Sequence, residues 1–287
     1  MRKLSDGLMD CLKSGFLTGI IQTVRDDYDL NLEIREDYLN IYFKGNSLLK
    51  LSQASSTRYK IEIHKKFTSG LNILSELKNE KDVFDFLNCI PQLKQNIIQH
   101  GKNALEIEYE QMIIRANNYE PRNNSEYFII DRQYTVSNIG RFDLTGIFWD
   151  RKRRRKYQVV DLCLMEVKCA LNQDINDVHH QLTRYYEALK SISVQIAEEC
   201  ETIFHQKLEL GLYAQAPDRL EAMKTLTISK DFSRFQFVLI LVDYNPNSVA
   251  LDLGNLVRLP FADQVKIFHA GLAMWQQNVK PVDNQSC

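Results

Sequence analysis

The sequence of 287 residues lacks any run of the roughly 20 apolar residues that a membrane-spanning helix requires. Its basic N-terminal segment has no apolar stretch of the kind found in signal peptides, because Asp6 and Asp10 interrupt it. None of the six cysteines forms a CxxC pair, and the six histidines show no metal-ligand spacing. These absences exclude a zinc motif and a disulfide framework, and they predict a soluble, cytoplasmic protein with reduced thiols.

The chain also lacks an excess of positive or negative residues, since the formal net charge is -1. A nucleic-acid-binding protein with this balance has to concentrate its basic residues locally. One such concentration is present, in a predicted turn. It is compatible with a solvated turn or with contact to a phosphate backbone, and we favour contact with nucleic acid. Its members are Arg151, Lys152, Arg153, Arg154, Arg155 and Lys156.

The composition is that of a globular protein, with 44% hydrophobic and 25% charged residues. Residues 1–95 are predicted to form an N-terminal accessory α+β region, with one helix over 6–24 followed by short strands. The strand segments LNLEI, YLNIYF, SLLKLS and YKIEIH alternate apolar and polar residues, which predicts an antiparallel meander. This region is a candidate surface for a protein partner or a second copy of the chain.

Residues 96–287 are predicted to form an α/β core with a mixed sheet, because hairpin and helical connections alternate. In the helix predicted over 103–118, the apolar stripe consists of Leu105, Tyr109, Met112 and Ile113. A strand, a hairpin, two helices, a buried strand and a closing helix are predicted to follow. Their ranges are 126–131, 141–168, 174–189, 194–212, 234–242 and 262–278, with Asn172 or Asp174 capping the first of the two helices.

The second arm of the hairpin, VVDLCLMEVKCAL, is an apolar strand that carries the charged residues Glu166 and Lys168. Side chains of a strand alternate between faces, so these two share a face and lie roughly 6.6 Å apart along the strand. Charges in an apolar strand need a partner or a metal ion, because burying an isolated charge is costly. The pair is either a salt bridge at an exposed strand end or part of a site.

The first arm supplies Asp143, which lies near Glu166 if the hairpin forms as predicted. Two adjacent carboxylates repel each other unless a cation lies between them. Mg²⁺ binds one or two carboxylates together with waters and phosphate oxygens. Lys168 is then placed to orient or deprotonate a water, or to stabilise charge on a phosphate. Asp161 is a rival carboxylate, although strand alternation places it on the opposite face unless a bulge intervenes.

Asp143 followed by Glu166-x-Lys168 at the end of an apolar strand resembles the PD-(D/E)xK nuclease superfamily. The next helix carries Gln181 and Tyr185, which resemble the Gln-x-x-x-Tyr pattern of the RecB-type exonuclease branch and share one helix face. The resemblance covers roughly residues 100–245. Asp143 follows a phenylalanine rather than the proline of the family pattern.

The resemblance implies a restriction-endonuclease-like fold and a Mg²⁺- or Mn²⁺-dependent nuclease that acts on DNA. It implies that Asp143, Glu166 and the backbone carbonyl of Val167 bind the metal ion. It also implies that Lys168 is catalytic, that the Gln-x-x-x-Tyr helix supports the site, and that an upstream helix supplies a glutamate. Glu110 and Glu106 are the candidates for that glutamate, with Glu110 preferred.

Acidic-x-Lys triplets by themselves carry little information, and this chain contains two others. Glu76-x-Lys78 lies in a segment predicted to be polar and helical, and Asp150-x-Lys152 begins the basic turn. Neither ends an apolar strand. One alternative remains open, in which the fold is a catalytically silent module that binds nucleic acid or a protein partner in a defence or repair assembly.

Overall fold

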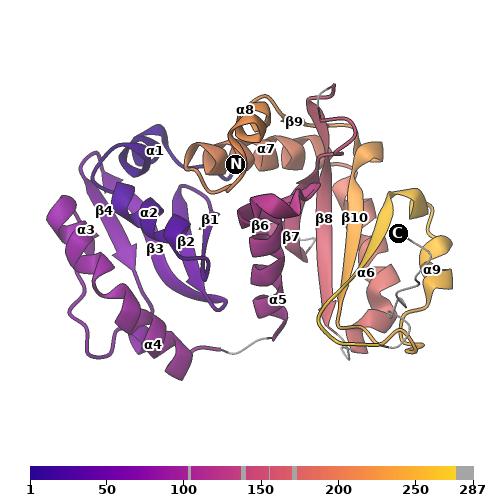
Figure 1. Ribbon diagram of the computed structural model, residues 1–287, viewed down its shortest axis with the longest axis horizontal. Helices are drawn as coiled ribbons and strands as arrows, with labels where there is room; N and C mark the ends of the chain where they lie inside the picture. The colour runs from indigo at the N-terminus through magenta and orange to yellow at the C-terminus, as the bar shows by residue number, and fades with distance from the viewer. Residues whose placement is uncertain (103–104, 137–139, 155, 170–172, 276–287) are drawn as a thin grey trace, which may run out of the picture.

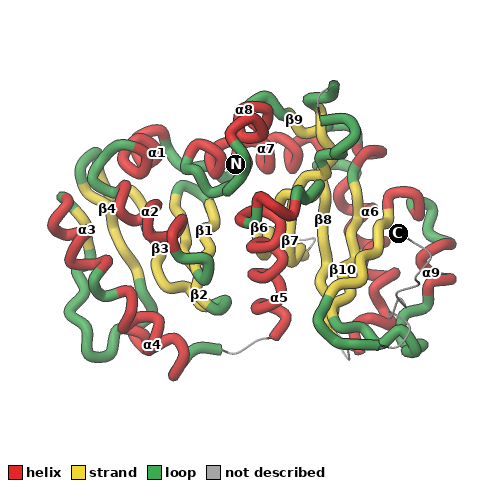
Figure 2. Tube along the Cα trace, viewed as in Figure 1, coloured by secondary structure: helices red, strands yellow, loops and turns green. Residues whose placement is uncertain are grey.

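The computed structural model of the chain contains two β-sheets that lie side by side, each with its own helices (Figures 1 and 2). The structure describes residues 1–102, 105–136, 140–154, 156–169 and 173–275. Within these ranges no helix is both long and apolar enough to cross a bilayer. The predicted mixed α/β class, with one antiparallel sheet and one mixed sheet, is confirmed.

The N-terminal sheet is an antiparallel meander in the order β1-β2-β3-β4-β5, as the alternating segments predict. Lys44 and Gly45 join β2 to β3, and both have positive φ (45° and 70°), as a two-residue hairpin turn requires. The strands are β1 (Leu30–Ile34), β2 (Tyr38–Phe43), β3 (Asn46–Ser55), β4 (Arg58–Glu62) and β5 (Glu76–Leu77).

Four helices accompany this sheet: α1 (Asp6–Lys13), α2 (Thr18–Asp26), α3 (Glu80–Leu87) and α4 (Ile90–His100). The prediction of one helix over 6–24 is wrong, because α1 ends before Gly15. A Cβ on that glycine would lie 2.8 Å from the Cα of Cys11, so only glycine fits the close approach at the bend. The segment containing Glu76 is also a strand rather than a helix, because β5 pairs with β4.

The second sheet has the order β11-β10-β8-β7-β6, with β9 paired to the start of β8. β6, β7 and β8 are antiparallel, whereas β8, β10 and β11 run parallel. The strands are β6 (Tyr127–Val136), β7 (Gly140–Phe148), β8 (Val159–Cys169), β9 (Thr227–Ile228), β10 (Gln236–Val242) and β11 (Val265–Ala270). The helices are α5 (Leu105–Ile114), α6 (Val178–Leu189), α7 (Ser193–Glu209), α8 (Pro217–Met223) and α9 (Leu253–Val257).

The central hairpin pairs as predicted, with Leu144 opposite Met165 and Ile147 opposite Leu162. Alternation along β8 separates its apolar residues into two clusters. Leu162 and Leu164 belong to the large core that includes residues of α6 and α7, and Met165 packs with Ile114 of α5 in a smaller cluster. Buried side chains from neighbouring helices and strands therefore cover both faces of β8.

The closing helix predicted over 262–278 is wrong, because Val265–Ala270 forms strand β11, parallel to β10. A short 3-10 turn, Ala262–Gln264, precedes the strand, and the side chain of Gln264 donates hydrogen bonds to Phe232 O and Phe235 O. The cap predicted for α6 also differs. α6 begins after Asp177, Asp174 lies in a preceding 3-10 helix, and Asn172 lies outside the described residues.

A buried set of ion pairs joins the two sheets. Lys207 on α7 donates to Glu33 on β1 at 2.7 Å, and Arg35 and Arg2 bind Asp131 on β6 at 2.5 and 2.9 Å. Large apolar side chains of both sheets also share one core cluster. The boundary predicted after residue 95 lies inside α4, which packs against β3 of the N-terminal sheet.

Candidate active site

The candidate site lies where β7 and β8 separate. Their pairing ends at Leu144 and Met165. One residue further, the Oδ2 atom of Asp143 accepts a hydrogen bond from the backbone N–H of Val167 at 2.9 Å. The aspartate side chain therefore satisfies a donor at the end of β8 and is held against that strand.

The separation coincides with a rotation of β7. Leu144 packs in the small cluster near α5, whereas Phe142 belongs to the large core. The centre of its ring lies 4.5 Å from that of Tyr185 on α6, and the two rings are tilted by 57°. Residues two apart in a regular strand share a face, so the strand turns over at Asp143. On the neighbouring strand β6, Gln133 has a positive φ of 55°, which marks the same irregularity. This distortion directs Asp143 into the gap between the arms.

Glu166 and Lys168 lie on one face of β8, as alternation predicts, with Lys168 Nζ 3.5 Å from Glu166 Oε2. Both residues are buried, at 3% and 7% exposure, so the exposed salt bridge considered from the sequence is wrong. The other carboxylate oxygen of Glu166, Oε1, has no hydrogen-bond partner among the described residues. A buried carboxylate oxygen of this kind is ready to accept a cation.

The pKa of Glu166 is raised to about 8, chiefly by burial and then by the neighbouring Asp143 carboxylate, while Lys168 opposes this rise. Because the Asp143 carboxylate contributes to the raised pKa of Glu166, the two carboxyl groups lie close to each other. The structure thus brings Asp143, Glu166 and Lys168 together.

The predicted Gln-x-x-x-Tyr pair faces the same place from α6. Gln181 Nε2 donates to the hydroxyl oxygen of Tyr185 at 3.0 Å, and that hydroxyl donates to the carbonyl of Arg141 on β7 at 3.2 Å. A hydrogen bond from Gln181 also favours the ionised form of Glu166. Gly140 permits this close packing, because a Cβ there would lie 2.8 Å from the Tyr185 ring.

Glu110 is also part of the site, and the apolar stripe predicted for its helix is confirmed only for Tyr109 and Ile113, which pack against the smaller cluster. Leu105 and Met112 are exposed, whereas Glu110 is only 1% exposed. Its carboxylate lies 3.4 Å from Arg132 Nη1 and 3.4 Å from Gln133 Nε2, both on β6. Arg132 and Gln133 are residues that the sequence does not mark, because nothing local indicates that β6 passes beside α5.

The pKa of Glu110 is raised to about 7, chiefly by burial; the charge of Arg132 opposes this rise and that of Asp143 adds to it. Since the Asp143 charge raises the pKa of both glutamates, it acts on both sides of the gap. Asp143 on β7 therefore lies within electrostatic range of both Glu110 on α5 and Glu166 on β8. Lys168 and Arg132 provide the adjacent positive charges.

Replacing Glu110 by glutamine is expected to flatten the pH dependence of folding stability. Glutamate in an unfolded chain ionises near about pH 4.3. In the folded protein the pKa of Glu110 is raised to about 7. The protonated carboxyl therefore makes its full contribution to stability at a pH below the unfolded pKa. This contribution is lost as the pH rises to the folded pKa, by up to about 3 kcal/mol.

Urea unfolding in EDTA between about pH 4 and pH 8 measures this effect. The free energy of unfolding of the wild type should fall with rising pH relative to that of the Glu110→Gln protein. The constant offset between the curves contains pH-independent effects of the substitution, such as changed contacts with Arg132 and Gln133, so the slope is the informative quantity. Parallel curves would contradict the prediction.

The residues of the site suit an oxygen-seeking divalent ion. They offer carboxylates rather than thiols or imidazoles, and one carboxylate oxygen is buried with no partner among the residues that the structure describes. Within the described part of the chain, no group of three or more His, Cys, Asp and Glu side chains forms a ready metal site. Mg²⁺ ordinarily uses one or two carboxylates and completes its shell with water and substrate oxygens.

The basic turn does not lie beside these residues. It precedes β8, whereas Glu166 lies near the other end of that strand, about 23 Å away at the usual rise per residue. Figure 1 shows the start of β8, which follows the basic turn, next to β9 and α8. Arg151, Lys152, Arg153 and Lys156 are exposed, Arg154 is half-buried, and Arg155 lies outside the described residues.

The other acidic residues considered from the sequence are engaged elsewhere. Asp161 pairs with Arg234 at 2.6 Å, away from the gap. Glu76 pairs with Lys78 at 3.5 Å on the edge strand β5. Both provide matched controls for substitutions in the candidate site.

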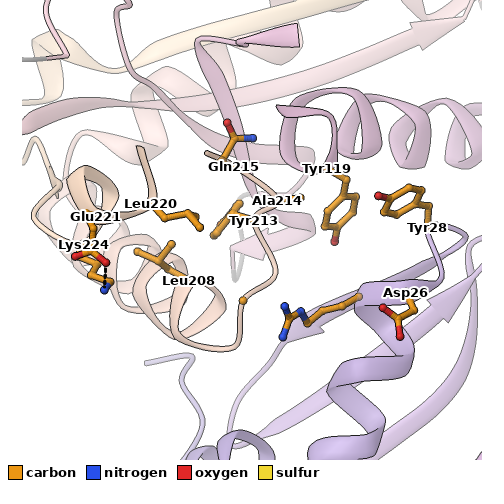
Figure 3. Close-up of a pocket in the computed structure, with 12 residues that line it drawn as sticks. Asp26, Tyr28, Tyr119, Leu208, Tyr213, Ala214, Gln215, Leu220, Glu221 and Lys224 are labelled. Atoms are coloured by element: carbon orange, nitrogen blue, oxygen red, sulfur yellow. Dashed lines mark hydrogen bonds and ion pairs between the residues drawn. The ribbon is translucent and has the colours of Figure 1, made fainter. Parts of the chain in front are cut away.

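A separate pocket of about 410 Å³ lies where the N-terminal region meets α7 and α8 (Figure 3). Its lining includes Tyr28 and Tyr119, whose rings stack at 6.0 Å, and Tyr213. None of the proposed catalytic residues lines this pocket. The sequence gives no signal for it, because its walls come from distant segments.

The chain matches no known family model, and no characterised protein or solved structure is significantly similar to it.

Proposed function

We propose that this protein is a metal-dependent nuclease that hydrolyses phosphodiester bonds in DNA, with a site of the PD-(D/E)xK type in a restriction-endonuclease-like core. One observation carries the proposal. Asp143 and Glu166 meet where the arms of a hairpin separate, Lys168 lies beside them, and one buried oxygen of Glu166 lacks a partner within the described part of the chain.

Asp143 and Glu166 would hold Mg²⁺ or Mn²⁺, with the Val167 carbonyl as a further ligand. When bound, such an ion stabilises charge on phosphoryl oxygens and makes a bound water more acidic. The amine of Lys168 would orient the attacking water or offset negative charge on the phosphate. Gln181 and Tyr185 hold Glu166 and β7 in position, and Glu110 completes the acidic side of the gap.

Titration with Mn²⁺ by calorimetry tests the metal site directly. We expect uptake by the wild type and at least about tenfold weaker binding by Asp143→Asn, since each ligand contributes strongly to affinity. Asp161→Asn is the matched control, because Asp161 makes a surface ion pair with Arg234. Equal Mn²⁺ affinity in both variants would contradict the assignment.

Cleavage of linear and circular DNA separates an enzyme from a silent module. The wild type should cut DNA in Mg²⁺ or Mn²⁺, and EDTA should reduce cutting to background. The two substrates also distinguish end-directed from internal cleavage. Binding of DNA without cleavage of either substrate would contradict nuclease activity and favour the module.

A further inference from the structure

Two arginines converge at the far end of the hairpin from the carboxylates. Arg154 lies in the basic turn and Arg219 on α8, and both guanidinium groups donate to the same acceptor, Asn124 Oδ1. Arg154 does so at 2.8 Å. Asn124 has a positive φ of 50°, which places its amide at the tip of a tight turn. Two like charges are thus held together by one neutral oxygen.

Both arginines are fixed by further neutral groups. Arg154 also donates to Trp149 O and Ser125 O, and its guanidinium lies 4.8 Å from the centre of the Trp149 ring. Arg219 also donates to Gln215. Neither forms an ion pair with a carboxylate within the described residues. Adjacent cations without a counterion repel each other, and an anion between them relieves that repulsion.

Burial and the nearby charge of Arg219 lower the pKa of Arg154 to about 10, which reflects the same crowding. Glu126 and Asp150 oppose this effect only in part. Glu126 Oε1 accepts from the backbone N–H of Arg151, and Asp150 pairs with Arg153 at 3.4 Å. The two carboxylates whose charges act on Arg154 therefore have other partners.

The paired arginines line a pocket of about 850 Å³. Its other walls include the basic side chains of Arg151, Lys152 and Lys156 and the ring of Trp149, with Asp218 as the acidic member. Guanidinium groups bind phosphate oxygens through paired N–H donors, and lysines add charge around them. The exposed ring of Tyr157, which also lines the pocket, suits contact with a nucleobase or sugar.

We propose that Arg154 and Arg219 form a phosphate-binding site for the backbone of a nucleic acid, remote from the reacting groups. The inference rests on the proposed function for the choice of nucleic acid as the ligand. The site holds the substrate about 23 Å along β8 from Glu166. Loss of its contacts therefore weakens binding without changing the chemistry at the carboxylates, and raises KM rather than lowering kcat.

Binding of a fluorescein-labelled DNA duplex, measured by anisotropy in EDTA over a series of salt concentrations, tests the site. Arg219→Gln should weaken binding by about three- to tenfold and reduce the salt dependence by about one counterion. Lys152→Gln, at an exposed pocket residue, should act in the same direction. Arg58→Gln is the control, because it removes the same charge from a guanidinium paired with Glu76 on the N-terminal sheet.

Arg154 is not the first residue to replace, because it also holds the turn through Trp149 and Ser125. Thermal unfolding should show that the three variants remain folded. Equal DNA affinity in Arg219→Gln and Arg58→Gln overturns the site. Loss of inorganic phosphate binding in Arg219→Gln with unchanged DNA affinity overturns its assignment to nucleic acid.

Because binding is measured in EDTA, the outcome does not depend on whether the protein cuts DNA. A protein that shows the Arg219 effect but no cleavage would retain the phosphate site and lose the nuclease assignment. A protein that cuts DNA but shows no Arg219 effect would retain the nuclease assignment and lose the phosphate site.

Discussion

Replacing Glu166 by glutamine is expected to abolish metal-dependent DNA cleavage and to leave the protein folded. Glutamine keeps the size of the side chain but removes the charge that would hold the ion. A loss of one electrostatic contribution of this kind lowers kcat by on the order of 10³-fold. Steady-state cleavage in Mg²⁺ and in Mn²⁺ measures the effect.

The same substitution at Glu76 provides the control. Glu76 and Lys78 have the same Glu-x-Lys spacing as Glu166 and Lys168, but they form a partly exposed pair on the edge strand β5. Glu76→Gln should therefore cut DNA at the wild-type rate. Cleavage at the wild-type rate by Glu166→Gln would contradict the role of Glu166 in the proposed site.

The stability of the Glu166→Gln protein separates lost chemistry from lost folding. Burial, and then Asp143, raise the pKa of Glu166 to about 8, so ionising this carboxyl opposes folding above the pKa of an unfolded glutamate. At pH 8 and without metal, the variant should be at least as stable as the wild type. Denaturant unfolding in EDTA gives that comparison.

Replacing Lys207 by methionine is expected to destabilise the protein by about 3–5 kcal/mol. Lys207 and Glu33 form a buried ion pair at 2.7 Å between α7 and the N-terminal sheet. Burial raises the pKa of Glu33, and the charge of Lys207 is the largest influence that lowers it. Without the lysine, the glutamate has to remain protonated or carry an uncompensated buried charge.

A double variant and an exposed pair complete this test. Glu33→Gln combined with Lys207→Met should recover most of the lost free energy of unfolding, since no buried charge then remains unpaired. Lys13→Met removes an exposed ion pair with Glu209, which joins α1 to α7 at 2.8 Å, and should cost less than about 1 kcal/mol. Equal costs for the Lys13 and Lys207 variants, measured by guanidinium unfolding, would contradict the role of burial.

The position of this junction links the N-terminal region to the site. Arg35 binds Asp131 through its Nη1 atom and the carbonyl of Arg132 through its Nη2 atom. Arg132 is the partner of Glu110. The N-terminal sheet therefore holds the segment of β6 that contacts the acidic gap.

Elements whose pattern depends on local alternation were predictable. The meander and the central hairpin follow from a period of two, and that period also placed Glu166 and Lys168 on one face. Asp143 was predictable as a neighbour of Glu166 from the hairpin alone. The rotation of β7 that directs its side chain into the gap was not, because it depends on packing between Phe142 and α6.

Elements that depend on distant partners were not predictable. Val265–Ala270 has a pattern compatible with a helix, and pairing with β10 decides for a strand. The buried carboxylate of Glu110 has its partner, Arg132, on β6, and the proposed phosphate-binding site includes Arg219 from α8. In each case the deciding partner lies far along the chain.

The sequence by itself determined the mixed α/β class, the hairpin and the identity of the charged residues on its arms, because side-chain alternation and turn chemistry act between near neighbours. Only the tertiary structure decided which charges are buried, which have partners and which lie together. Those properties depend on the loss of solvent and on contacts between segments that the chain separates.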